Sequence, residues 1–524
     1  MDLSQIVSPA DQEARSGRTR DRSMLITIAS AMVALSSSEA HIALAQSRWV
    51  PGPILAAPDP GNNDQLGEDV SISDNLAIAG AKFADGLVPD AGRALVFDAD
   101  TGALISTLVA QNGLSDSLFG ERVDISGTLA VVGSDDFDQP GLAAGAAYIF
   151  DAVTGDQLHF LQSADVQPVD FFGTDVAIDL DLAVIGARNA AVNGVDTGAA
   201  YIFDALTGDE TLKITPDDGV AFMDFGTAVE IDGPNVIIGA TLGAGRSEDT
   251  GAAYVYDAVT GVLLQKLFAD DGEQLDQFGI SVGISGDLAV VGSLSDDRGS
   301  SSGSVYVFDV ITGTQLHKLI PDTLESGDRF GESVSISETT VLAGAPSKDF
   351  ERIAAGAAWI YDAVTGGMEL SLALPNGRRN DLFGFGTGID GDRAIVGVLG
   401  EDIGVDDSGG VYSFKRIATE VVLEQISRCS SATEFTVSGA TADATIAVVA
   451  SREPALFQNP SGVCGGIYLN IDVPFIGGTP RQFTTNGLGQ SSFTANVKAP
   501  LCGDVFLQVV DLSTCDVSNA VRVR

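Results

Sequence analysis

Four short hydrophobic segments recur in a fixed order along most of the chain. In one copy an alternating segment, 281–284, is followed by a continuous apolar run at 288–291, an aromatic and β-branched run at 305–308 and a more polar run at 315–319. Alternation predicts a strand with one solvated face, whereas a continuous apolar run predicts a strand buried on both faces. Each copy therefore predicts four antiparallel strands, named a, b, c and d in chain order. The polar strand d is expected at the outer edge, where charge discourages pairing with other chains.

A Phe-Gly pair opens these copies at a constant period. The pairs begin at residues 119, 172, 225, 278, 330 and 383, with Leu66-Gly67 as a variant, so that successive pairs lie 53, 53, 53, 53, 52 and 53 residues apart. A period this constant is typical of repeat architectures. One four-stranded sheet cannot bury both of its faces, but a ring of such sheets can. The pattern predicts an all-β fold with a seven-bladed β-propeller.

The connection between strands c and d has the repeated sequence Asp-x-x-Thr-Gly. The Asp side chain can accept hydrogen bonds from the backbone that follows it, and the Gly can adopt positive φ without steric cost. We therefore interpret the repeated carboxylate as part of a structural turn and not as a catalytic or metal-binding group. Its six copies begin at Asp98, Asp151, Asp204, Asp257, Asp309 and Asp362.

The two ends of the repeat region complement each other. The seventh copy has strands a, b and c but continues into Lys415-Arg416-Ile417 with no Thr-Gly turn and no strand d. Residues 49–57 stand before the first copy, at the place where a strand d would lie. We expect this N-terminal strand to complete the last blade and so to remove an open sheet edge.

These residues resemble FG-GAP repeats, the units of the integrin α-subunit propeller and of many secreted bacterial proteins. The resemblance covers residues 50–416, and Gly344-Ala345-Pro346 matches the motif in full. It implies a propeller that binds macromolecules or glycans outside the cell, and in several integrin blades a bound calcium ion.

The calcium site of that family does not transfer to this sequence. The family holds the ion in an Asp-x-Asp-x-Asp-Gly loop between strands a and b, where a copy here has Ile284-Ser285-Gly286-Asp287. The nearest approaches are the pairs Asp179/Asp181 and Asp390/Asp392, and two carboxylates are too few for an ion that takes about six to eight oxygen ligands. We expect no cofactor, with calcium at these turns as the alternative.

The formal net charge of −44 bears on the charge of the partners that the protein can bind. Proteins that bind nucleic acid present Lys and Arg to the phosphates, so this charge argues against nucleic acid and favours cationic partners. The alternative is a solvated acidic surface that keeps the protein soluble.

The b–c loops differ from copy to copy, whereas the a–b and c–d turns are nearly identical. In a meander the b–c and d–a connections fall on one face of the disc, and recognition residues tend to lie on variable loops held by a rigid scaffold. We therefore expect an extracellular binding protein that presents acidic loops to a macromolecular or glycan ligand. The candidate ligand-binding residues are Asp135, Asp136, Asp138, Asp296, Asp297, Asp406 and Asp407.

The sequence contains no converging set of catalytic residues. His159 and His317 occupy equivalent places on strand d, and no cysteine falls within the propeller, which argues against acid–base pairs, thiolate catalysis and Cys/His zinc sites there. Quinoprotein propellers share an Asp-x-x-x-Gly turn but follow it with a tryptophan that this chain lacks. We expect no enzyme. The alternative is a secreted hydrolase or lyase that acts on polysaccharide or peptide through acidic loop residues.

Residues 1–45 have the features of a signal peptide. Four arginines precede an apolar segment at 24–35, and Ala43-Leu44-Ala45 has the small-x-small pattern of a cleavage site. No later segment has the roughly 18 consecutive apolar residues of a membrane span. The sequence therefore predicts a protein that is secreted or at the cell surface, with the propeller at 46–418.

The 53-residue period stops after the propeller, and residues 419–524 contain all the cysteines. Short alternating runs separated by Gly and Pro predict a small immunoglobulin-like β-sandwich. We expect a spacer role for it, with an adhesive accessory or a tag read by a bacterial secretion system as the alternatives. Four cysteines in an exported domain predict two disulfides, for which three connectivities remain open. They are Cys429, Cys464, Cys502 and Cys515.

Overall fold

The computed structural model describes residues 47–418, apart from 246–248, 296–300, 350–353, 375–376 and 404, and the C-terminal strands between 422 and 522. Every element among these residues is a β-strand, which confirms the all-β prediction. No helix in this part of the chain is long and apolar enough to cross a membrane. The predicted signal segment, 1–45, and the four cysteines of the predicted disulfides lie outside the described residues.

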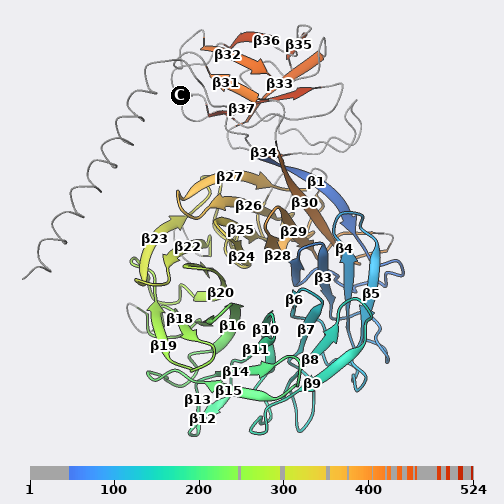
Figure 1. Ribbon diagram of the computed structural model, residues 1–524, viewed down its shortest axis with the longest axis vertical. Coiled ribbons are helices and arrows are strands. Elements are labelled where there is room, and N and C mark those ends of the chain that lie inside the picture. The colour runs from blue at the N-terminus through green and yellow to red at the C-terminus, as the bar shows by residue number, and fades with distance from the viewer. Residues whose placement is uncertain are drawn as a thin grey trace, which may run out of the picture. The chain divides into compact units, whose positions relative to one another are not determined.

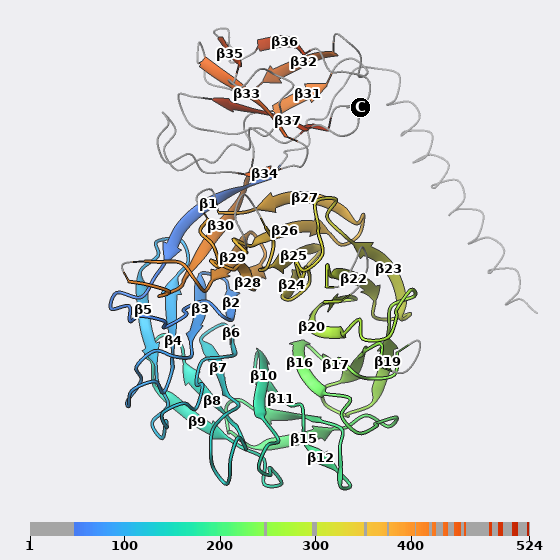
Figure 2. The ribbon, with the colours of Figure 1, turned by 180° about the vertical axis from the view of Figure 1, so that it is seen from behind.

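Seven sheets surround a central opening, as Figures 1 and 2 show from opposite sides. Each sheet runs from strand a at the opening to strand d at the periphery, which confirms the seven-bladed β-propeller. Strand a is β2 (Val70–Ser73), β6 (Val123–Ser126), β10 (Phe172–Asp179), β16 (Phe225–Asp232), β20 (Phe278–Ser285), β24 (Val334–Ser337) and β28 (Phe383–Asp390). Strand b is β3 (Leu76–Ala81), β7 (Leu129–Ser134), β11 (Leu182–Ala187), β17 (Asn235–Ala240), β21 (Leu288–Ser293), β25 (Thr340–Ala345) and β29 (Arg393–Val398).

The two outer strands complete each blade. Strand c is β4 (Arg93–Asp98), β8 (Ala146–Asp151), β14 (Ala199–Asp204), β18 (Ala252–Asp257), β22 (Ser304–Asp309), β26 (Ala357–Asp362) and β30 (Gly410–Ala418). Strand d is β5 (Leu104–Leu108), β9 (Gln157–Leu161), β15 (Glu210–Ile214), β19 (Leu263–Leu267), β23 (Thr314–Leu319), β27 (Gly367–Leu372) and β1 (Ser47–Leu55). A small hairpin, β12 (Ala191–Val192) and β13 (Val195–Asp196), lies in the b–c loop of blade 3.

The Phe-Gly pair joins neighbouring blades. Phe225 packs edge-on against Tyr254 of strand c in its own blade, with ring centroids 5.4 Å apart. Gly226 has a φ of 91°, and a Cβ there would lie 2.4 Å from the carbonyl oxygen of Ala199 in the preceding blade. The pair recurs because one residue fills the blade interior while the next lets two backbones approach closely.

The predicted N-terminal strand completes the last blade. β1 pairs antiparallel with β30, with Ile54 opposite Tyr412 and Leu55 opposite Val411, in a sheet of order β1-β30-β29-β28. This confirms that both ends of the repeat region share one sheet.

The Asp-x-x-Thr-Gly segments form the predicted turns. Asp151 Oδ1 accepts hydrogen bonds from the backbone of Val153 and Thr154, and the N–H of Gly155 donates to the Asp151 carbonyl. In the turn of blade 1, hydrogen bonds from the Thr101 side chain and backbone hold the pKa of Asp98 below its ordinary value. The carboxylates of these turns are therefore already occupied as hydrogen-bond acceptors within the turns.

A ring of hydrogen bonds follows the a–b rim of the central opening. The last residue of every strand a accepts a hydrogen bond through its side chain from a backbone N–H in the a–b turn of the next blade. The seven pairs are Ser73 with Gly127, Ser126 with Leu180, Asp179 with Gly233, Asp232 with Gly286, Ser285 with Glu338, Ser337 with Gly391 and Asp390 with Asp74.

The described C-terminal strands form two sheets and one short addition. The sheets have the orders β31-β32-β36 and β35-β33-β37-β38, and β34 pairs in parallel with β27. The sandwich packing of the two sheets stays a prediction. The strands are β31 (Val422–Gln425), β32 (Thr433–Ser438), β33 (Thr445–Ser451), β34 (Ala455–Leu456), β35 (Arg481–Thr484), β36 (Ser491–Ala495), β37 (Phe506–Asp511) and β38 (Val521–Arg522).

Candidate functional site: the loop face and the central channel

The b–c and d–a connections form one face of the propeller, which we call the loop face. The N–H of Val169 in a d–a loop donates to the carbonyl of Leu142 in a b–c loop at 2.8 Å, and the N–H of Leu275 donates to the carbonyl of Asp249 in the same way. The b–c loop of a blade is therefore in direct backbone contact with the d–a loop that leaves the same blade, so both lie on one face, as the meander predicts.

The predicted acidic residues lie in different surroundings on this face. Asp135 is only 7% exposed, Asp136 is half-buried, and Asp138 is exposed while its carboxylate accepts the N–H of Ala143 in its own loop. Asp406 and Asp407 are exposed in the b–c loop of blade 7, with blade 1 between them and the three residues of blade 2. Asp296 and Asp297 lie outside the described residues. The structure thus brings together the blade 2 residues and separates them from the blade 7 pair.

Asp135 and Glu121 form a buried carboxyl pair. Burial raises the pKa of Asp135 to about 8, and the negative charge of Glu121 adds to the effect. Burial also acts on Glu121, but the positive charges of Arg122 and Lys82 hold its pKa below the ordinary value. Asp135 therefore keeps its proton at neutral pH.

Ion pairs join the inner loops of the first three blades. Lys82 Nζ lies 2.6 Å from Glu68 and 3.1 Å from Glu121, which connects blades 1 and 2. Arg122 lies 3.7 Å from Asp175 and connects blades 2 and 3. These basic residues are therefore already engaged by carboxylates of the protein.

The central opening contains a cavity of about 460 Å³ lined by strand a of every blade. Three carboxylates on its wall accept hydrogen bonds from the inner-edge backbone of the next blade: Asp69 from Val123, Asp124 from Ile178 and Asp175 from Val229, at 2.7–2.8 Å. Strand a has no neighbour on its inner side, so its N–H groups need such partners. These carboxylates stabilise the open edges that face the channel.

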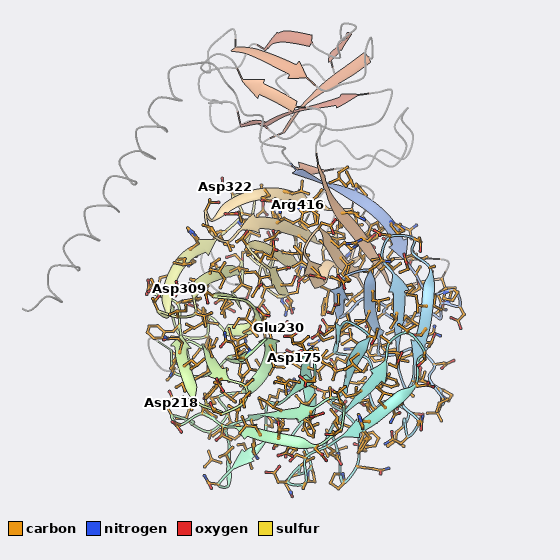
Figure 3. All side chains as sticks on the ribbon, in the orientation of Figure 1. Asp175, Asp218, Glu230, Asp309, Asp322 and Arg416 are labelled. Carbon is orange, nitrogen blue, oxygen red and sulfur yellow. The ribbon has the colours of Figure 1, made fainter. Side chains whose placement is uncertain are left out.

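The channel carboxyl groups hold their protons more tightly than in water. Burial raises the pKa of Asp124 and of Asp175 to about 7. Burial, together with the charge of Asp124, raises the pKa of Glu230 well above its ordinary value. Figure 3 shows Asp175 and Glu230 at the inner ends of their blades, beside the central opening. The channel is an acidic, partly protonated environment.

Sequence analysis did not single out this channel cluster. The signal was present, because Asp69, Asp124, Asp175 and Glu230 stand where the other copies of strand a have Ser, Ala, Gly or, at Arg122, a base. Only the ring shows that these positions of different repeats converge on one axis.

The turns considered for calcium are engaged in other contacts. Asp179 accepts the N–H of Gly233 and Asp390 that of Asp74, while Asp392 pairs with Arg393 at 2.7 Å. Within the described ranges, no three His, Cys, Asp or Glu side chains are arranged to hold a metal ion.

The two histidines of strand d connect neighbouring blades. His159 Nε2 forms a hydrogen bond with the carbonyl of Leu206, and His317 Nε2 with that of Val364, both at 2.9 Å and both in the c–d turn of the next blade. Gln265 donates to the carbonyl of Ile311 in the same way. This is the place of the tryptophan in quinoprotein propellers, and in blades 2, 4 and 5 a polar side chain docks the next blade instead.

The comparison with protein families agrees with this architecture. The family model described as "FG-GAP repeat" matches residues 49–97, 104–150, 157–203, 209–256, 262–308 and 314–361, together more than half of the chain. Each match begins on strand d of one blade and ends on strand c of the next, so the first one includes β1 as a strand d.

A search of the curated proteins found no match. Among solved structures, the crystal structure of the computationally designed Ika8 protein is similar at 16% identity and a TM-score of 0.41, covering 70% of this chain and 100% of its own. The repeats and the propeller indicate a role in protein interaction. On the strength of the six matched segments and the seven blades, the chain belongs to the FG-GAP repeat family.

Proposed function

We propose that the protein is an extracellular binding protein whose loop face holds a cationic macromolecule, in particular a protein segment rich in Lys and Arg. Export by the predicted signal segment, 1–45, supports the extracellular part of this proposal. The net charge of −44 supports the cationic ligand, because it draws basic partners toward the protein and repels acidic glycans.

The observation that carries the proposal is a set of exposed carboxylates in the variable loops of the loop face. On the loop face, Asp196, Asp217, Asp270 and Glu273 are exposed, and none of them pairs with a cation among the described residues. On the opposite face the repeated Asp residues are engaged in the c–d turns, as Asp151 shows. The loops that differ between copies thus carry exposed carboxylates, as expected for a surface that recognises a specific partner.

A binding array tests this function directly. The full mature chain would be applied to matrix proteins and glycans, with and without a calcium chelator, and we expect binding to basic proteins that survives chelation and weakens with salt. Combined replacement of Asp196, Asp217 and Asp270 by Asn should weaken the binding. The matched control replaces Asp181, Asp209 and Asp287, which lie exposed in the turns of the other face, and should bind as the unchanged protein does.

The alternative, a hydrolase or lyase, would make best use of Glu121 and Asp135. Their pKa values are shifted in opposite directions, as an acid and its partner require. Asp135 is only 7% exposed, however, so a polymeric substrate does not reach it. Turnover of a polysaccharide or peptide that is lost on Glu121→Gln would favour the enzyme over the binding protein.

A further inference from the structure

Two positions of the d–a loop have a left-handed backbone in every blade, one directly before the Phe-Gly pair and one three places before it. The residue three places before the Phe-Gly pair adopts a left-handed φ between 60° and 94°. Glycine, asparagine and aspartate tolerate this conformation, whereas it is an outlier for bulky or β-branched residues. Four copies carry the tolerant types, and the three loops that precede blades 3, 4 and 5 carry large apolar residues instead. The seven residues are Asn63, Asp116, Val169, Phe222, Leu275, Gly327 and Asn380.

The three apolar residues at this position are exposed. Val169 is 48% exposed, Phe222 64% and Leu275 58%. A strained residue that points into solvent adds nothing to the core, and strained backbone of this kind concentrates at binding sites. Exposed apolar residues alone need no explanation, but these three also hold a left-handed backbone that their side chains disfavour.

Two further exposed apolar residues lie beside them. The N–H of Val169 donates to the carbonyl of Leu142, which is 70% exposed, and the N–H of Phe222 donates at 2.6 Å to Asp196, next to Val195, which is 40% exposed. We call Leu142, Val169, Val195, Phe222 and Leu275 the apolar ridge. Its residues lie in the b–c loops of blades 2 and 3 and in the d–a loops that precede blades 3, 4 and 5.

The loops that carry the ridge are anchored by a repeated triad. Four residues before each apolar residue, an Asp accepts hydrogen bonds from a Tyr hydroxyl and a Lys of the following blade, and each Lys lies over its Tyr ring. The triad of blade 4 lies at the periphery, where Figure 3 labels Asp218. The anchors are Asp165 with Tyr201 and Lys213, Asp218 with Tyr254 and Lys266, and Asp271 with Tyr306 and Lys318.

This anchoring explains how the strained conformation persists. The Lys nitrogen lies 4.9–5.1 Å from the ring centroid in the three blades, so the geometry of each anchor is the same. Such contacts fix the start of each loop, while the Phe-Gly pair fixes its end. The apolar residues are therefore presented on rigid supports, which lowers the entropic cost of binding a partner.

We propose that the apolar ridge is the docking surface for a partner protein segment that presents apolar side chains flanked by Lys or Arg. This proposal rests on the proposed function and adds to it an apolar contact between the protein and its partner. The basic flanks follow from charge complementarity, because the exposed Asp196, Asp217 and Glu273 lie in the same loops as the ridge. The same acidic groups repel an anionic lipid surface and the like-charged face of a second copy.

Binding to designed peptides tests the ridge. Fluorescent peptides of equal length, alternating Leu with Lys, Ser with Lys and Leu with Ser, would be titrated with the full mature chain. The ridge variant combines Val169→Asn, Phe222→Asn and Leu275→Asn, because Asn63 and Asn380 occupy this position in other blades. We expect the variant to bind the Leu-Lys peptide about tenfold more weakly or worse, and to melt at a higher temperature because the strain is relieved.

The matched control removes the same kind of residue from the opposite face. It combines Val153→Asn, Leu206→Asn and Val259→Asn, at exposed apolar positions of the c–d turns, and should leave the affinity unchanged. Weakening by both variants to the same extent would overturn the ridge as a specific surface.

The remaining outcomes separate this proposal from the function on which it rests. If the ridge variant keeps its affinity while the variant of Asp196, Asp217 and Asp270 loses it, the ridge is wrong and the acidic face stands. If neither loses affinity, both proposals fail. If the Leu-Ser peptide binds as tightly as the Leu-Lys peptide, the proposal that the partner has basic flanks is wrong. Ridge-dependent binding to phosphatidylserine vesicles, or ridge-dependent self-association in sedimentation, overturns the protein partner.

Discussion

The carboxylate of Asp390 in blade 7 accepts a hydrogen bond from the backbone N–H of Asp74 in blade 1 at 2.6 Å. It is the seventh link of the rim, and it joins residues 316 positions apart, whereas the link from Ser73 to Gly127 spans 54. Such a long-range contact forms only when the ring closes. The seam between blades 7 and 1 should therefore govern how cooperatively the propeller unfolds.

Asp100 reinforces this seam. It lies 3.0 Å from Arg393 and 2.9 Å from Lys415 of blade 7, and the equivalent residues of blades 2 to 6 are apolar, as Val259 is. Hydrogen bonds from Lys415 and Arg393 lower the pKa of Asp100. We expect Asp100→Val to reduce the free energy of unfolding by about 0.5–1 kcal/mol, since the pairs are partly exposed.

Urea unfolding at low and high salt checks this prediction. The difference between the two proteins should shrink in high salt, where the ion pairs are screened. Val259→Ala serves as the control and should change stability by less than about 0.5 kcal/mol. A salt-independent loss in Asp100→Val would point to a cause other than the ion pairs.

Substitutions of two neighbouring residues of β1 test whether the N-terminal strand packs into the last blade. Leu55 is fully buried and Ile54 is 46% exposed, because they point to opposite faces of the strand. We expect Leu55→Ala to lower the free energy of unfolding by about 2–4 kcal/mol and Ile54→Ala by less than about 1 kcal/mol. Chemical denaturation followed by fluorescence measures both. Equal effects would mean that β1 is not packed as this sheet requires.

The channel carboxyl groups make stability depend on pH. Because the folded pKa of Asp124 and Asp175 is about 7, above the ordinary value, the folded state retains protons that the unfolded chain has released between about pH 4 and 7. Their contribution to stability is fully present below pH 4 and is lost as the pH rises to 7. Asp175→Asn keeps an acceptor for Val229 and removes the titration, so we expect a flatter profile and about 1–3 kcal/mol more stability at pH 8.

Unfolding curves at several pH values between 4 and 8 measure this effect. Asp98→Asn is the control, since the pKa of Asp98 is lowered by hydrogen bonds from Thr101 and its contribution is lost only as the pH falls through the acid range. Parallel profiles of Asp175→Asn and the unchanged protein would contradict the protonated channel.

Sequence patterns predicted the parts of the fold that each repeat determines by itself. The apolar runs of strands b and c and the Phe-Gly pair are visible within a single copy. The missing strand d after 411–414 is visible when the seventh copy is compared with the others. The role of Asp135 could not be predicted, because its burial depends on Glu121 and on Arg188 of the next blade, 3.9 Å away. The channel cluster likewise depends on the ring that brings different strands a together.

The apolar ridge could be predicted from the sequence only in part. The series Asn, Asp, Val, Phe, Leu, Gly, Asn at one repeat position is visible in the sequence. Its meaning depends on φ, which only the structure gives, because apolar loop residues otherwise suggest burial. Comparing the backbone conformation of the repeats thus identifies residues that do not suit their position, which a comparison of hydrophobicity alone does not identify.

His317 distinguishes a docking role from a catalytic one. Its ring packs against Gly366 of the next blade, where a Cβ would lie 2.8 Å from Nδ1, and its Nε2 bonds to the carbonyl of Val364. Gln265 makes the same connection in blade 4 at 2.8 Å. We therefore expect His317→Gln to change the free energy of unfolding by less than about 0.5 kcal/mol, while His317→Ala lowers it by about 1 kcal/mol. Both variants should keep ligand affinity on the array, because this contact lies away from the loop face. If Gln were as damaging as Ala to stability, or if either abolished an activity of the protein, the imidazole itself would be required and the docking interpretation would be wrong.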